Sequence, residues 1–115
     1  PDIAAVGGIL DLLELAELAE QQGVQISPHC SSSMTVAAAA MLHVCASIPN
    51  AELAEIYPAY IPDSEKFALK AFHLEGEYAH LSYKPGIGVD LNVSALHTLC
   101  EHHQSTCLSL AEATC

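Results

Sequence analysis

Asp2 and His29 are the two residues whose types and spacing best suit proton transfer. Both are expected at the carboxyl end of a short parallel strand, the edge where α/β proteins place their active sites. A carboxylate that accepts one ring N–H fixes the tautomer of an imidazole and raises the basicity of its other nitrogen. The pair therefore predicts a general base that removes a proton from carbon. The alternative is that Asp2 caps the following turn while His29 is an ordinary loop histidine.

Alternating strands and helices are expected to bring this pair together. Residues Pro1–Val6 suggest the end of a strand, and the two glycines that follow permit a sharp turn. Apolar residues at helical spacing predict a helix over Ile9–Gln22 with acidic residues on its solvent face. Val24–Ser27 alternates between apolar and polar residues, which predicts a strand, and Pro28–Ser33 is expected to be a loop.

The rest of the chain continues this alternation. The almost wholly apolar stretch Met34–Ser47 predicts a helix that is buried on several sides. Further elements are expected as a strand over Ala51–Tyr57, a loop over Pro58–Asp63, a hairpin over Phe72–Tyr83 and a helix over Val93–His103 capped by Asn92. Strands that alternate with helices form a parallel sheet, but about three strands cannot close a barrel. The sequence therefore indicates part of a larger α/β domain.

The acidic composition excludes several classes of partner. The chain has 3 Lys+Arg against 14 Asp+Glu, a formal net charge of -11. Neutralising phosphates needs a basic surface, so a nucleic-acid binder is excluded and docking on an anionic membrane is disfavoured. The longest apolar stretch, Val36–Cys45, is too short to span a bilayer. The 5 cysteines form no regular framework, which indicates reduced thiols in a cytoplasmic protein.

The chain is also unusually apolar for its length. Of its 115 residues 51% are hydrophobic and 15% are charged, so a folded domain is expected rather than a disordered chain. A domain this small leaves much of its surface wet, and we expect something outside the chain to cover part of it. The isolated chain is expected to expose apolar surface around Val36–Cys45 and to form homo-oligomers.

Several stretches, in order, resemble one enzyme family. Pro1–Ile9 is similar to the end of the sixth barrel strand and the start of the next helix in the mandelate racemase/muconate lactonizing enzyme family of the enolase superfamily. Ile26–Ser32 resembles the end of its seventh strand, Ala46–Ala51 and Leu53–Tyr57 resemble its eighth strand and the approach to it, and Pro85–Asp90 resembles its closing Pro-Gly-Leu-Gly motif.

The resemblance implies a fold and a division of the chain. The fold is α/β, the C-terminal part of a (β/α)7β TIM-like barrel with a C-terminal hairpin and helix, incomplete as a domain. Residues 1–103 form the barrel segment, and residues 104–115 are a tail that is expected to be disordered. The chain begins at Pro1 and is expected to be the last quarter or third of an enzyme.

The resemblance also implies an activity and residue roles. Enzymes of this family bind a carboxylate substrate on Mg²⁺, and a base removes the proton alpha to the carboxylate to form an enediolate. The longer parent enzyme is then a sugar-acid dehydratase or a hydroxy-acid racemase or epimerase. His29 matches the family's base on the seventh strand and Asp2 its supporting aspartate. Glu55, with Glu52 as an alternative, matches a residue that contacts the substrate carboxylate.

Other parts of such a site are expected outside this chain. Ser31 and Ser32 are expected near the substrate, but the family's acidic metal ligands, lysine base and capping domain would all precede Pro1. The lysines at 66, 70 and 84 do not match the lysine-base motif. We therefore expect the chain alone to bind no catalytic Mg²⁺ and to be inactive. Its expected partners are the remainder of the barrel, the capping domain and a small-molecule carboxylate.

A rival interpretation is a non-catalytic, acidic, helix-rich module that binds a partner or zinc through its C-terminal end. The candidate zinc ligands are His97, Cys100, His102, His103 and Cys107, although their spacing fits no zinc-ribbon or finger pattern. Four other residues have simpler expected roles: a satisfied core histidine at His43, cross-strand packing for His73 and His80, and a small loop-filling residue at Cys30.

Overall fold

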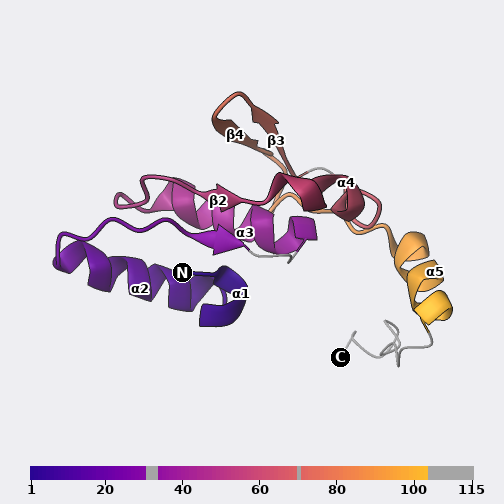
Figure 1. The fold of residues 1–115 in the computed structure, drawn as a ribbon, viewed down its shortest axis with the longest axis horizontal. Helices are drawn as coiled ribbons and strands as arrows, with labels where there is room; N and C mark the ends of the chain where they lie inside the picture. The colour runs from indigo at the N-terminus through magenta and orange to yellow at the C-terminus, as the bar shows by residue number, and fades with distance from the viewer. Residues whose placement is uncertain (31–33, 70, 104–115) are drawn as a thin grey trace.

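The computed structural model describes residues 1–30, 34–69 and 71–103. In chain order the elements are α1 (Ile3–Val6), α2 (Ile9–Gln21), β1 (His29–Cys30), α3 (Met34–Ser47), β2 (Glu55–Ile56), a 3-10 turn (Pro58–Tyr60), α4 (Ile61–Ser64), β3 (Phe72–Glu75), β4 (Tyr78–Leu81) and α5 (Val93–His103). Helices α1 to α3 and the short strands β1 and β2 form a body from which the β3–β4 hairpin and α5 project (Figure 1). The radius of gyration is 15.6 Å, above the about 13 Å expected for a compact domain of this length.

The strands of the body are parallel and are joined by helices, so the fold is α/β. β1 pairs with β2, and on its other side His29 bridges to Asp2. The His29 N–H donates to the Pro1 carbonyl at 2.7 Å, and the Glu55 N–H donates to the Pro28 carbonyl at 2.9 Å. α2 and α3 therefore act as the crossovers that a parallel sheet requires.

Four predicted elements are confirmed closely. The helices expected over residues 9–22, 34–47 and 93–103 are α2, α3 and α5, and the expected hairpin is β3–β4. The backbone N–H of Ala95 donates to the side chain of Asn92 at 3.2 Å, so Asn92 caps α5 as expected.

The predicted strands at the first two positions were misplaced. The strand expected over Pro1–Val6 ends at Asp2, because the Asp2 carboxylate caps α1 and starts a helical turn there. In Val24–Ser27 only Ile26 forms a bridge, and the ladder resumes at His29 and Cys30, which the sequence placed in a loop. Backbone partners on both neighbouring strands hold β1 extended, and no local pattern reveals them.

The last strand and the loop after it also differ from expectation. Of Ala51–Tyr57, only Ala51 and the two residues of β2 pair with other strands. The segment Pro58–Asp63, expected to be a loop, contains the 3-10 turn and most of α4. A proline stands in the first turn of each, where its fixed φ favours a helix and its missing N–H costs nothing.

Helix α3 forms the centre of the core, as its sequence predicts. It contacts α1, α2, α4, β1 and β4. The buried cluster consists of Ile3, Leu12, Cys30, Ala38, Ala40, Met41, Leu42 and Val44. The apolar surface expected around Val36–Cys45 is found at the start of the helix, where Val36 is 43% exposed, whereas Met41 and Val44 further along it are buried.

Polar side chains fix the ends of α3 to its neighbours. The Asn50 amide just after α3 is buried and donates to the carbonyls of Ala16 and Val24 at 2.9 and 3.2 Å. Near the start of α3 the buried hydroxyls of Thr35 and Ser64 bond at 2.5 Å. These bonds connect segments far apart in sequence, and they are strengthened by the low dielectric of the interior.

His43 does not have the expected satisfied environment. It is partly buried on α3, and its buried Nε2 finds no hydrogen-bond partner among the described residues.

Within the described ranges, no helix has the length and apolar character that a membrane crossing needs.

Replacing Leu12 by alanine should destabilise the fold, because this fully buried side chain leaves a cavity between α2 and α3. We expect Leu12→Ala to lose about 2–5 kcal/mol of unfolding free energy in urea denaturation followed by circular dichroism. Leu18→Ala on the same helix is the matched control, since Leu18 is 64% exposed, and it should change stability by less than about 0.5 kcal/mol. Equal effects of the two variants would contradict this packing.

The isolated chain should bind a hydrophobic dye. An apolar hollow of about 360 Å³ lies between the start of α2 and α3, and Ile9 and Val36 line it. Val36→Glu should reduce the fluorescence of bound anilinonaphthalene sulfonate, whereas Val24→Glu, at an exposed position outside the hollow, should not. A monodisperse monomer without dye binding would show that this surface is not available.

Candidate active site

The site begins at Asp2, whose carboxylate contacts two parts of the structure. Its Oδ1 accepts the backbone N–H of Ala4 at 2.8 Å and so caps α1. Gly7 caps the end of α1, and Gly7 and Gly8 have φ angles of 113° and 102°, in the left-handed region that favours glycine. The expected sharp turn is therefore present, and it lets α2 start directly after α1.

The second carboxylate oxygen of Asp2 binds His29. Oδ2 lies 3.1 Å from the His29 Nδ1, and the side chains of His29 and Asp2 are 38% and 20% exposed. A carboxylate can only accept a hydrogen bond, so Nδ1 carries the hydrogen and Nε2 keeps its lone pair. The arrangement suits an imidazole that accepts a proton at Nε2 from a molecule in solution. Both interpretations of Asp2, helix cap and histidine partner, hold at once.

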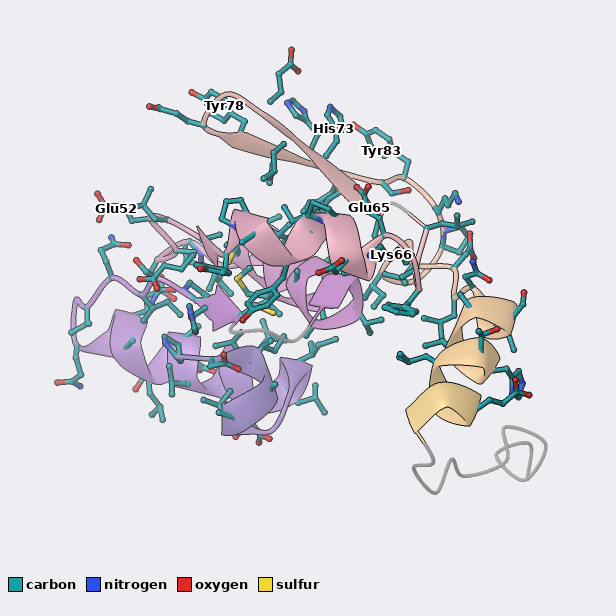
Figure 2. The ribbon with its side chains drawn as sticks, turned by 45° about the vertical axis from the view of Figure 1, so that its right-hand side comes forward. Glu52, Glu65, Lys66, His73, Tyr78 and Tyr83 are labelled. Carbon is teal, nitrogen blue, oxygen red and sulfur yellow. The ribbon has the colours of Figure 1, made fainter. Side chains whose placement is uncertain are left out.

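Glu55 completes a row across three neighbouring strands. It pairs in register with His29, which bridges on its other side to Asp2. The spacing along the two paired segments differs. Ile26 pairs with Ala51, and His29 lies three positions after Ile26, whereas Glu55 lies four positions after Ala51. The segment from Ala51 to Glu55 thus holds one extra residue, which is the pattern of a β-bulge. As a result Glu55, rather than Glu52, lies beside His29. Glu52 lines a separate hollow that faces the hairpin, and Figure 2 shows it away from the helices.

The other predicted site residues are only partly described. Ser31 and Ser32 lie outside the described residues, as does Cys107 of the rival zinc cluster. His97 is exposed on α5, while nothing is described for the side chains of Cys100, His102 and His103.

Two of the lysines form ion pairs at the surface. Lys66 pairs with Asp63 at 2.7 Å, and Lys84 pairs with Asp90 at 2.9 Å.

Burial makes Cys30 and Cys45 poorly suited to act as nucleophiles. Cys30 is buried in β1 rather than filling a loop, which corrects the expectation from sequence. Burial raises the pKa of the Cys45 thiol above its ordinary value, which disfavours the reactive thiolate.

The metal-binding capacity of the described residues lies elsewhere, in a group that sequence reasoning missed. His73, Glu75 and His80 on the hairpin bring three ligand atoms within 4.8 Å of one another. Mg²⁺ prefers a set of oxygen ligands, and two imidazoles do not fit it. The signal in the sequence was the alternation of His73 and Glu75, two residues apart on one face of a strand.

Comparison with known proteins identifies the family. A model described as enolase C-terminal domain-like matches residues 1–95. The chain belongs to this family. The resemblance to mandelate racemase and muconate lactonizing enzymes is thereby confirmed, and the Asp2–His29 pair lies within the matched part of this enolase-superfamily chain.

The similar curated proteins are dehydratases. The chain is 33% identical over 103 residues to a D-galactonate dehydratase of Ralstonia nicotianae, a match that covers 80% of this chain and 25% of the relative. It is 36% identical over 98 residues to a D-galactonate dehydratase of Klebsiella pneumoniae, with the same coverage. This enolase-superfamily chain thus spans about a quarter of the length of the curated relatives it matches.

Solved structures show the same fold. An enolase from environmental shotgun sequencing of the Sargasso Sea is 45% identical, with a TM-score of 0.81 over 86% of this chain and 26% of its own. An enolase from Pantoea ananatis with bound D-gluconate and Mg is 24% identical, with a TM-score of 0.72 over 84% of this chain and 23% of its own. At that identity the second structure supports the fold alone.

Replacing Asp2 by asparagine should move the hydrogen of the His29 ring. The asparagine carbonyl can still cap α1 through Ala4, so its NH2 group then faces His29 and donates to Nδ1. We expect the ring to change from the Nδ1–H to the Nε2–H tautomer, as measured by long-range ¹⁵N–¹H correlation spectra. Glu55→Gln is the control and should leave the tautomer unchanged. Persistence of Nδ1–H in Asp2→Asn would rule out the described bond.

Proposed function

We propose that this chain supplies the proton-transfer residues of a sugar-acid dehydratase. The observation that carries the proposal is the Asp2–His29 bond at the carboxyl end of neighbouring parallel strands. Active sites of α/β proteins lie at this edge of the sheet. The names of the curated relatives, D-galactonate dehydratases, support a sugar acid as the substrate.

His29 is proposed to act as the general base. Asp2 holds the Nδ1–H, which leaves the lone pair of Nε2 to take the proton alpha to the substrate carboxylate. The Asp2 carboxylate also stabilises the imidazolium that His29 becomes when it takes this proton. Loss of the hydroxyl group at the neighbouring carbon then gives an enol, and the enol becomes a 2-keto-3-deoxy acid. The protonated His29 is a suitable donor to the leaving hydroxyl group, since it lies in the same site.

Glu55, Ser31 and Ser32 are proposed to contact the substrate. The register beside His29 favours Glu55 over Glu52 for this role. A carboxylate there would accept hydrogen bonds from the substrate's hydroxyl groups.

The remaining parts of the enzyme are proposed to lie outside these 115 residues. Residues 1–103 would form the last part of a (β/α)7β barrel, with residues 104–115 as a tail, and the rest of the barrel and a capping domain would complete it. The acidic ligands of Mg²⁺ would come from those other parts, as the family resemblance implies. The chain alone would then be inactive.

A racemase or epimerase would use the same first step. Removal of an alpha proton by His29 is common to both reactions, so the geometry of the pair does not distinguish them. The dehydratase is favoured because both curated relatives described above carry that name.

The test uses the longer enzyme that contains this segment, supplied with Mg²⁺ and a panel of sugar acids. Formation of the 2-keto acid is followed with semicarbazide. We expect dehydration of a sugar acid such as D-galactonate, and a loss of kcat of about 10²–10⁴-fold in His29→Asn, the usual contribution of a general base.

The matched control is His97→Asn, because His97 is an exposed histidine on α5. It should retain full activity. Undiminished turnover in His29→Asn would refute the proposed base. Exchange of the alpha proton with solvent without loss of water would instead identify a racemase or epimerase.

A further inference from the structure

The β3–β4 hairpin has one apolar and one polar face. Its antiparallel register pairs Phe72 with Leu81 and His73 with His80. Phe72 and Leu81 pack against the core cluster, so one face of the ribbon points to the body. Since side chains alternate along a strand, His73 and His80 lie on the opposite face. Figure 2 shows His73 and Tyr78 on this outer side.

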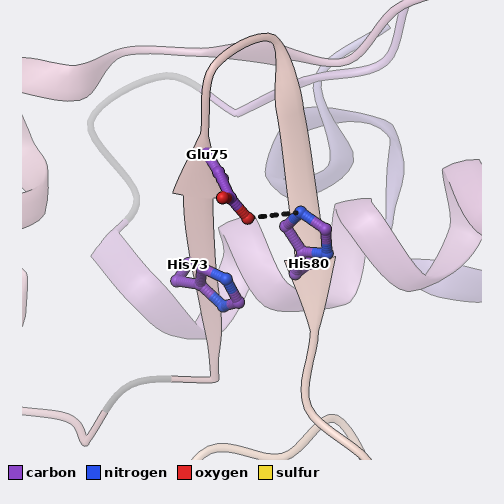
Figure 3. A group of neighbouring side chains, drawn as sticks. All are labelled: His73, Glu75 and His80. Atoms are coloured by element: carbon purple, nitrogen blue, oxygen red, sulfur yellow. Dashed lines mark ion pairs between the residues drawn. The ribbon is translucent and has the colours of Figure 1, made fainter.

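Three potential metal ligands gather on the outer face. The His73 and His80 rings stack with centroids 4.6 Å apart and planes at 13°. Glu75 lies two residues after His73 on the same strand, and its Oε2 is 3.5 Å from the His80 Nε2 (Figure 3). One ligand atom from each residue lies within 4.8 Å of the other two. Two strands thus bring two imidazoles and a carboxylate close together on one face of the hairpin.

Cross-strand packing, the role expected from the sequence, accounts for only part of this arrangement. The stacked rings explain the His73–His80 pair, but both rings are exposed and bury little apolar surface. The 3.5 Å separation between Glu75 and His80 is too long for a good hydrogen bond. The three groups are therefore close together without bonding one another strongly, and their lone pairs are available to a cation.

We propose that His73, Glu75 and His80 bind a zinc-like divalent cation, with water as the fourth ligand. Imidazole and carboxylate ligands suit Zn²⁺, and three protein ligands with one open position are a common zinc arrangement. Tetrahedral bonds of about 2.0–2.1 Å bring neighbouring ligand atoms to about 3.4 Å. Binding requires the stacked His73 and His80 rings to rotate until their in-plane lone pairs meet at the ion, and the exposure of both side chains leaves room for this rotation.

The bound ion would join the two strands of the hairpin. β3 supplies His73 and Glu75, while β4 supplies His80. A cation that binds only the paired form stabilises it by mass action. This site is separate in sequence and in strand from the Asp2–His29 pair, and it does not depend on the proposed dehydratase activity.

The first test titrates the full 115-residue chain with Zn²⁺ and follows the histidine rings by NMR. Resonances of His73 and His80 should shift together and saturate at one equivalent, while those of His29 should remain in place. Cobalt serves as a spectroscopic substitute, and a visible spectrum without thiolate charge transfer is expected from ligands that contain no sulfur. Absence of shifts at His73 and His80 would overturn the proposal.

The second test compares variants by calorimetry with Zn²⁺. His80→Gln and Glu75→Gln should each lower the affinity at least about tenfold, since even outer-shell changes cost that much. Glu77→Gln is the matched control, because it removes the same charge from the turn of the same hairpin, and it should bind normally.

A second control addresses the histidines and cysteines beyond Val93. His97→Gln should leave the NMR-detected site unchanged. Unchanged affinity in both His73→Gln and His80→Gln would place the ion elsewhere and overturn the proposal, as would a cobalt spectrum with thiolate charge transfer that persists in His80→Gln. If a hairpin variant fails to fold, the NMR titration of the unsubstituted chain with Zn²⁺ still tests the proposal.

Discussion

The carboxylate of Asp2 connects the local structure of this chain to its chemistry. One oxygen accepts the Ala4 N–H and starts α1, and the other accepts the His29 Nδ1–H. The helical turn fixes the orientation of the carboxylate, and the oriented carboxylate fixes the tautomer of the imidazole. A single side chain thus couples the end of one strand to the residue at the end of the next. The chemistry of His29 depends on this coupling more than on any other contact described.

The packing of α3 makes that coupling possible. Because α3 is apolar on nearly all sides, it can contact α1, α2 and β1 at once and hold the parallel strands in register. Buried hydrogen bonds from Asn50 and Thr35 then fix its two ends. The packing nevertheless leaves an apolar hollow beside Val36.

Helices, caps and the hairpin could be predicted from the sequence, whereas the pairing of the parallel strands could not. The periodic residues of α2 and the Asn92 cap of α5 are local signals, and both predictions are confirmed. The two residues of β1 are extended because of partners distant in sequence, so they were mistaken for loop. For the site, the Asp2–His29 contact was expected from the positions of the two residues at strand ends, and the family resemblance supported it. The choice between Glu52 and Glu55 needed the register, and the hairpin cluster needed the pairing of His73 with His80.

The extra residue between Ala51 and Glu55 has a consequence for how such a site can change. Glu55 reaches the His29 row only because four positions, rather than three, separate it from Ala51. A regular ladder without this extra position would place Ala54 in that row and exchange a carboxylate for a methyl group. No substitution would be needed, and the neighbouring side chains would keep their identities. The third member of the row is therefore encoded by chain length as much as by amino-acid type, and alignments of relatives should be read with that spacing in mind.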